Sequence, residues 1–345
     1  MTAHALQTVR ARARLRWEPW RRSPRVWFGL LAAALVAITL VSLAQGAGTA
    51  SVREAVAALV QAEHPAHDVL WEIRVPRIAV AGLVGAALAV AGALLQTVLR
   101  NPLADPGLLG VTAGAGLGAL CAILFLPHEP WWVPTLAFAG GVLGLACSLL
   151  AAHANAGPLN PLRLILAGVG LQAIGMAGVA LLVFFFADRA PAFVAFTVGS
   201  LNGSGWPELV RVAVPTALGG LAALAAVRAL DVLLLDDGSA GSVGLPVVRV
   251  RQALAGAAAL LTAGAVSVVG LVGFVGLVVP NALRLVIGPA HGPLLGLAVL
   301  GGAGLVIGAD AIARTAIAPL EIPVGALLAL VGGPFLLYLL WRSPA

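Results

Sequence analysis

The sequence predicts an all-α, polytopic membrane protein with about ten transmembrane helices. Of its 345 residues, 61% are hydrophobic and only 10% are charged, whereas a soluble domain carries roughly 25% charged residues. Apolar stretches of about 20 residues, long enough to cross a hydrocarbon core of about 30 Å as a helix, recur along the whole chain. The alternating polar and apolar segments that indicate an outer-membrane barrel are missing. Such a chain cannot cover a water-facing surface.

The first element is a basic segment, residues 1–25, followed by the transmembrane domain, residues 26–345. A cleaved signal peptide is the alternative interpretation, but the apolar run Val26–Ala44 is too long for a typical signal sequence. The positive-inside rule therefore places the N-terminus in the cytoplasm. The arginines that precede this run are Arg10, Arg12, Arg14, Arg16, Arg21, Arg22 and Arg25.

Glycine, proline and charged residues divide the chain into about ten predicted spans. An even number of spans puts both termini in the cytoplasm and leaves most arginines on the inner side. Arg53, Arg74, Arg77, Arg189, Arg211 and Arg314 fall on the outer side. The spans cover residues 26–45, 76–98, 107–126, 132–152, 162–187, 209–229, 251–269, 271–287, 293–316 and 324–342.

Between the second and third spans lies the polar stretch "RNPLADPGLLGVTAGAGLG". A residue before proline avoids the helical region, so we expect a turn at the cytoplasmic surface, with Asp105 as the N-cap of the next span. Glycines spaced by four residues then form one helix face suited to close packing in lipid. The residues concerned are Asn101, Pro102, Asp105, Pro106, Gly110, Gly114 and Gly118.

All 20 basic residues are arginine, and a chain without lysine can form neither a P-loop nor a Schiff base. The letters Gly168-x-Gly170-x-x-Ala173 match a dinucleotide fingerprint, but they lie inside an apolar span, where helix packing explains them better. Cys121 and Cys147 fall within spans and indicate neither a disulfide framework nor a metal site.

Two longer polar pieces interrupt the spans. Residues 51–75 form an outer loop that begins as an amphipathic helix, and residues 230–250 form an inner loop. His64 and His67 in the outer loop suggest a metal or haem site, because imidazole ligates both, although loop histidines are usually solvated. Their role stays open at this stage.

Two long blocks of sequence are similar to a known family. They are "RVPRIAVAGLVGAALAVAGALLQTVLRNPLADPGLLGVTAGAGLGA" (Arg74–Ala119) and "GLVGFVGLVVPNALRLVIGPAHGPLLGLAVLGGAGLVIGADAIARTAIAPLEIPVGALLALVGGPFLLYLLWR" (Gly270–Arg342). Both resemble the iron-chelate, haem and vitamin B12 permeases, the membrane subunits of type II ABC importers. With the 230–250 loop, the resemblance covers nearly the whole chain from residue 27.

The resemblance implies the type II ABC importer permease fold in the bacterial inner membrane, surrounded by lipid. It also implies a homodimer with its pathway on the two-fold axis, two ATP-binding cassette subunits in the cytoplasm and a periplasmic substrate-binding protein. The chain itself then binds no cofactor and is not an enzyme, because ATP is used by the partner subunit. Haem is the favoured cargo, followed by a ferric siderophore and cobalamin. No nucleic acid partner is implied.

The resemblance also implies roles for particular residues. Arg74, Arg77 and Arg314 correspond to arginines that grip carboxylates of the binding protein, a task suited to the guanidinium fork. ATPase coupling falls to Asp237, Ala240, Gly244 and Leu245. Structural or pathway candidates are Asn101, Pro102, Asp105, Pro106, Gly110, Gly114, Pro280, Asn281, Arg284, Asp310, Glu321 and Pro323.

The chain departs from the family pattern at a few of these positions. Asn281 stands where the family usually has a histidine, and Asp236 and Gly241 are unusual in the coupling loop. Asp310 is the one carboxylate clearly inside a predicted span, and Arg314 one turn later would neutralise it as an i,i+4 pair.

Two other classes of function remain as alternatives. A proton-coupled secondary transporter of a small solute usually threads several ionisable groups through its spans, whereas Asp310 is the chief one here. A membrane-embedded enzyme needs a buried catalytic constellation, and no predicted span contains a histidine apart from His153 at an inner end.

Overall fold

The computed structural model describes residues 23–45, 51–61, 63–129, 131–153, 161–235 and 237–342. The predicted basic segment up to Arg22, and Asp236, lie outside the described residues. Within them, seven helices are long and apolar enough to span a membrane, and shorter apolar helices complete the set of predicted spans. The prediction of an all-α, polytopic fold is confirmed. The spanning helices are α2 (Pro24–Ala44), α4 (Val75–Val98), α5 (Val111–Phe125), α6 (Trp132–His153), α7 (Pro161–Phe185), α9 (Trp206–Ala225), α12 (Val247–Val269), α13 (Val275–Ile287), α14 (His291–Thr315) and α15 (Val324–Arg342).

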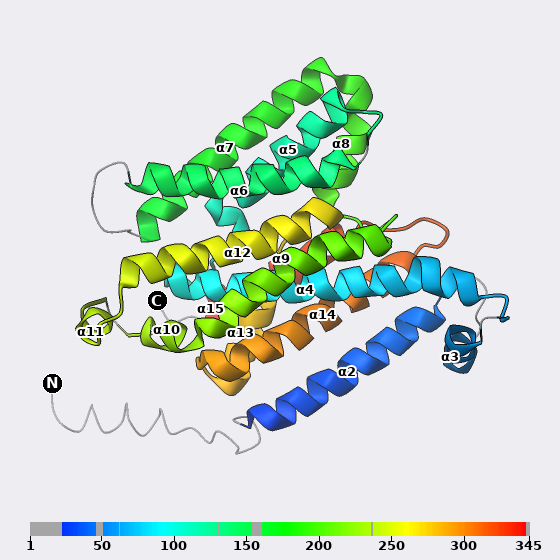
Figure 1. The fold of residues 1–345 in the computed structure, drawn as a ribbon, viewed down its shortest axis with the longest axis horizontal. Helices are drawn as coiled ribbons and strands as arrows, with labels where there is room; N and C mark the ends of the chain where they lie inside the picture. The colour runs from blue at the N-terminus through cyan, green and yellow to red at the C-terminus, as the bar shows by residue number, and fades with distance from the viewer. Residues whose placement is uncertain are drawn as a thin grey trace.

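Helix α4 lies at the centre of the bundle, with α9, α12, α13 and α14 packed around it (Figure 1). Its sequence makes this possible, because alanines and glycines let neighbouring backbones approach closely. A side chain added at Gly85 would collide with the Gly302 carbonyl in α14, and one at Gly92 would collide with Gly276 in α13. Small residues therefore hold the three helices in direct backbone contact.

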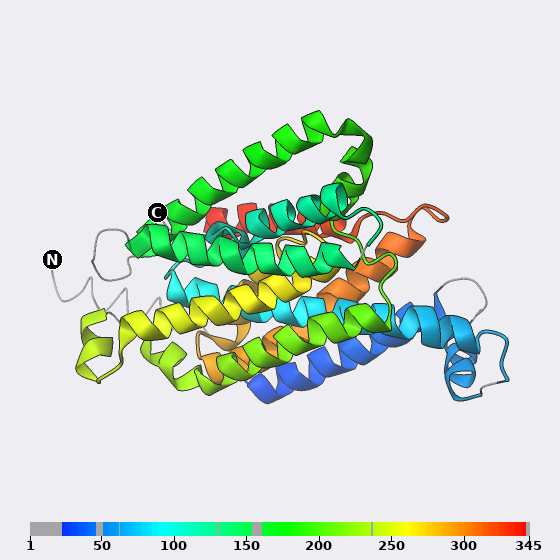
Figure 2. The same cartoon turned by 45° about the horizontal axis from the view of Figure 1, so that its top comes forward.

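Helices α5, α6 and α7 form a second group against α12, together with the short α8 (Ala190–Val198) (Figures 1 and 2). The predicted glycine face of α5 packs on α6. A side chain at Gly114 would collide with the Gly140 carbonyl, and one at Gly118 would collide with the Leu136 carbonyl. The packing interpretation of this glycine spacing is confirmed.

The peripheral helices α2 and α7 expose most of their apolar side chains, such as Leu30 and Phe184. Helix α2 lies along α14 on one side of the bundle (Figure 1). Apolar surface on this scale is suited to lipid or to another apolar protein surface.

The two ends of the bundle differ. One end, called here the α3 end, carries α3 (Val52–Val60), the π-helical turn η2 (Val69–Arg74) that leads into α4, and the turn 316–323. The opposite end, called the α11 end, carries α10 (Val227–Val232) and α11 (Asp237–Ser242) (Figure 1). The amphipathic start predicted for residues 51–75 is confirmed as α3, whose N-cap Ser51 accepts a hydrogen bond from the Glu54 N–H.

The structure differs from the sequence predictions in several details. Helix α8 lies between two predicted spans, where no helix was predicted, and the 230–250 segment contains short helices rather than loop alone. Pro106 begins the 3₁₀ turn η3 (Pro106–Leu109), and α5 starts only after Gly110, whose φ of 74° separates the two elements. Helix α14 begins at His291, two residues earlier than predicted, so a histidine does lie in a spanning helix.

Candidate functional sites at the two ends of the bundle

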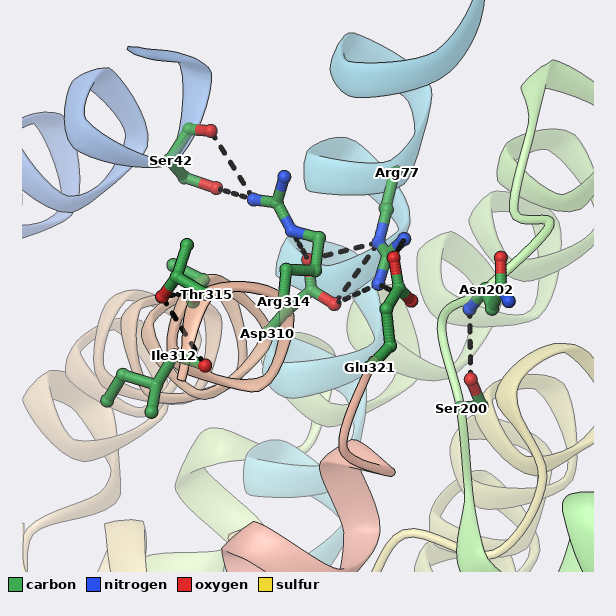
Figure 3. A network of polar contacts seen from close by, with 10 residues as sticks. Ser42, Arg77, Ser200, Asn202, Asp310, Ile312, Arg314, Thr315 and Glu321 are labelled. Carbon is green, nitrogen blue, oxygen red and sulfur yellow. Dashed lines mark hydrogen bonds and ion pairs between the residues drawn. The ribbon is translucent and has the colours of Figure 1, made fainter. Parts of the chain in front are cut away.

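At the α3 end, Arg77 of α4 joins two carboxylates (Figure 3). Its Nη2 lies 2.9 Å from Asp310 Oδ1 in α14 and 2.9 Å from Glu321 Oε2 in the turn before α15. Its Nε donates to both Asp310 oxygens at 3.2 Å, and its Nη1 donates to Glu321 Oε1 at 3.1 Å. The Asp310 side chain is 2% exposed and that of Glu321 is 35% exposed, so the network runs from the interior to the surface.

Arg314 extends the network to α2. Its Nε lies 3.1 Å from Asp310 Oδ2, which confirms the predicted i,i+4 pair, and its Nη2 donates to Ser42 Oγ at 2.7 Å (Figure 3). Arg74 also contacts α2, because its Nη1 donates to the Leu43 carbonyl at 2.6 Å. The three arginines predicted to dock a binding protein thus lie at one end of the molecule, as the prediction requires.

These contacts have a structural consequence. The network ties α2, α4, α14 and the turn 316–323 together, and Pro323 ends that turn directly before α15. Arg74 and Arg77 are both buried. The docking role of the arginines stays a prediction, and in this conformation their guanidinium groups are already held within the chain.

The polar stretch after α4 folds as two short side-chain-supported turns. Asn101 Oδ1 accepts from the Leu103 N–H at 2.9 Å, and Asp105 Oδ1 accepts from the Gly107 N–H at 2.9 Å. Asp105 caps the 3₁₀ turn η3, whereas the N-cap of α5 is Gly110, so the prediction that Asp105 caps the next span is wrong. Burial raises the pKa of the Asp105 carboxyl, and the Gly107 N–H opposes this shift.

At the α11 end, polar side chains join the end of α4 to α13. Arg284 donates to Gln96 Oε1, and Gln96 Nε2 donates to the Gly276 carbonyl at 3.0 Å. Asn281 Nδ2 donates to the Pro102 carbonyl at 2.7 Å, so the residue that departs from the family pattern holds the turn after α4. Pro280 is buried within α13.

A histidine that sequence reasoning missed lies beside this cluster. His291 is fully buried, with its Nδ1 2.9 Å from Asp231 Oδ1 in α10 and its Nε2 2.7 Å from Thr97 Oγ1 in α4. Its position between Pro289 and Pro293, directly at a helix start, was the available signal.

The segment predicted to contact the ATPase, residues 230–250, is called the coupling segment below, and it packs on the bundle through some residues and exposes others. Ala240 is fully buried, and Leu245 is partly buried against the core. Gly244 has a φ of 86° and open space around it. The side chain of Asp237 lies outside the described part of the chain. Three apolar side chains of the segment are exposed: Leu234, Leu235 and Val243, the last by 69%. They form an apolar surface next to the polar residues of α11.

The outer-loop histidines make local contacts. His67 Nδ1 lies 2.8 Å from the Ala58 carbonyl, and His64 Nδ1 accepts from the Ala66 N–H at 3.2 Å. Among the described residues there is no group of three or more His, Cys, Asp or Glu side chains that could hold a metal ion. The metal or haem role considered for these histidines thus gains no support from the geometry.

Comparisons with known proteins match most of this chain. A model of the FecCD transport family matches residues 34–342. The chain is 38% identical to the hemin transport system permease protein HmuU of Yersinia pestis, over 94% of this chain and 97% of that protein. It is 39% identical to the Fe(3+) dicitrate transport system permease protein FecD of Escherichia coli, over 82% of this chain and 88% of that protein. A solved inward-facing ABC transporter described as metal-chelate type covers 93% of this chain and is itself fully covered, with a TM-score of 0.83 and 31% identity.

Proposed function

The chain belongs to the FecCD transport family of ABC importer permeases, and on this premise we propose that it carries haem across the bacterial inner membrane as a homodimer. ATP hydrolysis by separate cassette subunits drives the movement, and a periplasmic binding protein delivers the cargo. A ferric siderophore is the second candidate cargo and cobalamin the third. The observation that carries the proposal is the match to known ABC permeases over nearly the whole length of both chains.

The two ends of the bundle support separate contacts with the ATPase subunit and with the binding protein. The exposed apolar residues of the coupling segment suit a groove in an ATPase subunit, because exposed apolar surface next to polar residues is typical of interaction sites. The arginine network at the opposite end suits an acidic partner. On this arrangement the α11 end faces the cytoplasm and the α3 end faces the periplasm.

Haem is preferred over cobalamin because of coverage, but coverage does not separate it from iron citrate, since the Fe(3+)-citrate import system permease protein YfmE of Bacillus subtilis matches 93% of this chain and 96% of its own. HmuU matches this chain over nearly all of both sequences, whereas the cobalamin permease BtuC of Halobacterium salinarum, at 40% identity, matches 80% of this chain and 74% of its own. The identities themselves differ too little to decide between cargoes.

Docking of a binding protein requires an exchange of partners at Arg77. Asp310 is buried, but Glu321 is partly exposed, so a carboxylate of the binding protein can replace Glu321 on the outer edge of the guanidinium group. Asp310 would keep the inner edge throughout. The exchange trades one charge-assisted pair for another and therefore costs little.

The secondary transporter alternative fits the geometry less well. Its chief candidate, Asp310, is held by Arg77 and Arg314 together. Both oxygens of this carboxylate accept hydrogen bonds from guanidinium groups of the chain itself, an arrangement typical of a structural ion pair. The membrane-enzyme alternative lacks support from the family match.

The test is reconstitution of the permease with its ATPase subunit and binding protein in proteoliposomes. We expect ATP-dependent uptake of haemin to exceed uptake of ferric citrate or cobalamin, and we expect the permease alone to hydrolyse no ATP. Uptake driven by a proton gradient without ATPase subunits would overturn the proposal.

A substitution locates the ATPase contact. Val243→Asp places a charge on the exposed apolar surface of the coupling segment and should abolish co-purification of the ATPase subunit. Gly241→Ala, two residues earlier near the end of α11 and with open space around it, is the control and should retain it.

A further inference from the structure

His291 joins three elements at the α11 end. It is the first residue of α14, and its two ring nitrogens contact side chains from α10 and α4. Nδ1 lies 2.9 Å from Asp231 Oδ1, and Nε2 lies 2.7 Å from Thr97 Oγ1. One side chain therefore connects the coupling segment to the central helix of the bundle.

The chemistry of the partners fixes the direction of the bond to Asp231. A carboxylate only accepts, so Nδ1 carries the proton in this contact. Thr97 Oγ1 lies 2.7 Å from Nε2 and 3.1 Å from the Ala93 carbonyl, so its hydroxyl either donates to Nε2 or accepts from a protonated Nε2 and donates to Ala93. Asp231 Oδ1 also accepts from the His291 backbone N–H at 2.8 Å, which places a negative charge at the N-terminus of α14, where the helix dipole favours it.

The surroundings show why this link matters more than the packing beside it. Leu230 and Leu233 anchor the coupling segment in the core, but a cavity of about 480 Å³ separates Leu233–Leu235 from the last turn of α4. Thr97, Arg100 and Arg284 line the same cavity. Across this space the segment is joined to the end of α4 and to the turn after it by polar contacts, including the hydrogen bond from Arg100, which follows α4, to the Leu235 carbonyl. These hydrogen bonds are directional and hold only in one arrangement.

We propose that His291 is a positioning residue that transmits movement of the coupling segment to α4 and α14. This inference rests on the proposed function, since an ATPase subunit must move the segment. When the ATPase displaces α10, Asp231 carries the first turn of α14 with it, and Thr97 draws the end of α4 along. Without the His291 contacts, the segment moves into the adjoining cavity, and ATP hydrolysis is no longer coupled to transport.

The two nitrogens of His291 can be tested separately. His291→Asn retains an amide near the Nδ1 position and keeps the Asp231 contact, whereas His291→Gln reaches the Nε2 position and keeps the Thr97 contact. Thr97→Val removes the hydroxyl with little change in volume, and Thr97→Ser restores it. Thr262→Val is the matched control, because Thr262 is equally buried but bonds only the Ala258 carbonyl of its own helix.

The measurement is haemin uptake per ATP hydrolysed in proteoliposomes that contain the full complex. We expect Thr97→Val, His291→Asn and His291→Gln each to lower this ratio at least about fivefold, the lower end of common coupling energies. ATPase co-purification should stay unchanged, and Thr97→Ser and Thr262→Val should keep the wild-type ratio.

The outcomes separate this inference from the function on which it rests. If the wild-type complex couples ATP hydrolysis to uptake and Thr97→Val retains the same ratio, the inference is wrong while the proposed function stands. If the wild-type complex shows no ATP-dependent uptake, the proposed function fails and the inference fails with it. A lower ratio in Thr262→Val equal to that in Thr97→Val would also overturn the link, because any buried threonine would then have the same effect.

Discussion

At the scale of single residues, the ion network at the α3 end shows what sequence spacing can and cannot reveal. The Asp310–Arg314 pair was predictable because residues four apart on a helix are neighbours. The Arg77–Asp310 pair joins residues 233 positions apart, and no local rule points to it. The docking role predicted for the arginines comes from the family resemblance, and the sequence shows their charge but not their burial.

The stability of this network gives the first prediction. Arg77→Met should lower the free energy of unfolding by about 3 kcal/mol, because it leaves two carboxylates short of a partner, one of them buried. Arg314→Met should cost less, since Arg77 still holds Asp310. Unfolding in mixed micelles measures both. Arg211→Met, which breaks the exposed pair with Glu208, is the control and should cost less than about 1 kcal/mol. Equal losses in all three variants would contradict the assigned network.

The proposed exchange at Arg77 gives the second prediction. Glu321→Gln removes the competing charge and should therefore tighten docking of the binding protein at low salt. Salt should weaken the docking of this variant more steeply, because a larger share of the contact is then electrostatic. Titration of labelled binding protein onto the permease in nanodiscs measures the affinity at several ionic strengths. Docking that is weaker than wild type, or unaffected by the substitution, would show that Glu321 does not compete for Arg77.

At the scale of helices, the sequence predicts well which spanning helices exist and in what order, and it predicts their exact ends less well. Long apolar runs are decided by burial in lipid, so each spanning helix was predicted within a few residues. Helix ends depend on local turns. Gly110 separates the 3₁₀ turn from α5, and α14 begins at His291, two residues before its predicted start. These two extra residues matter, because they include the histidine that the predicted spans left out.

The contact between α5 and α6 gives the third prediction. A Cβ at Gly114 would collide with the Gly140 backbone, so Gly114→Ala must separate the two helices. We expect it to lower the free energy of unfolding by about 1–3 kcal/mol, as overpacking usually does. Gly116→Ala in the same helix meets no atom within 4 Å and should be neutral or slightly stabilising, since alanine favours helix. A greater loss at Gly116 than at Gly114 would refute the close packing.

At the scale of the whole molecule, the structure concentrates different chemistry at the two ends of one helix. Helix α4 begins beside the arginine network and ends, after Thr97, beside the coupling segment. Its buried surface includes many small residues, and at Gly92 and Gly85 it packs directly against the backbones of α13 and α14. A rigid central helix of this kind can relate events at the two ends of the bundle. The sequence located both ends, but it could not show that one helix joins them through side-chain contacts.

The orientation of the molecule gives the last prediction. Within the described spans and turns the arginines are spread over both ends, and those at the α3 end include Arg74, Arg77 and Arg314, which are held by contacts inside the chain. Orientation then depends on the basic segment that precedes Val26, which the positive-inside rule assigns to the cytoplasm. We therefore expect the α11 end to face the cytoplasm and the α3 end to face the periplasm.

Single cysteines test this assignment in a variant whose own thiols are replaced by alanine (Cys121→Ala and Cys147→Ala). Glu63→Cys at the α3 end should react with a membrane-impermeant thiol reagent in spheroplasts, because Glu63 is exposed on the predicted outer loop. Gly241→Cys in α11 should react only in inverted vesicles. Leu181→Cys, on the exposed apolar face of α7, is the control and should react in neither, since lipid would shield it from a charged reagent. Labelling of Gly241→Cys in spheroplasts would reverse the orientation, and an ATPase subunit in the cytoplasm could then no longer reach the coupling segment.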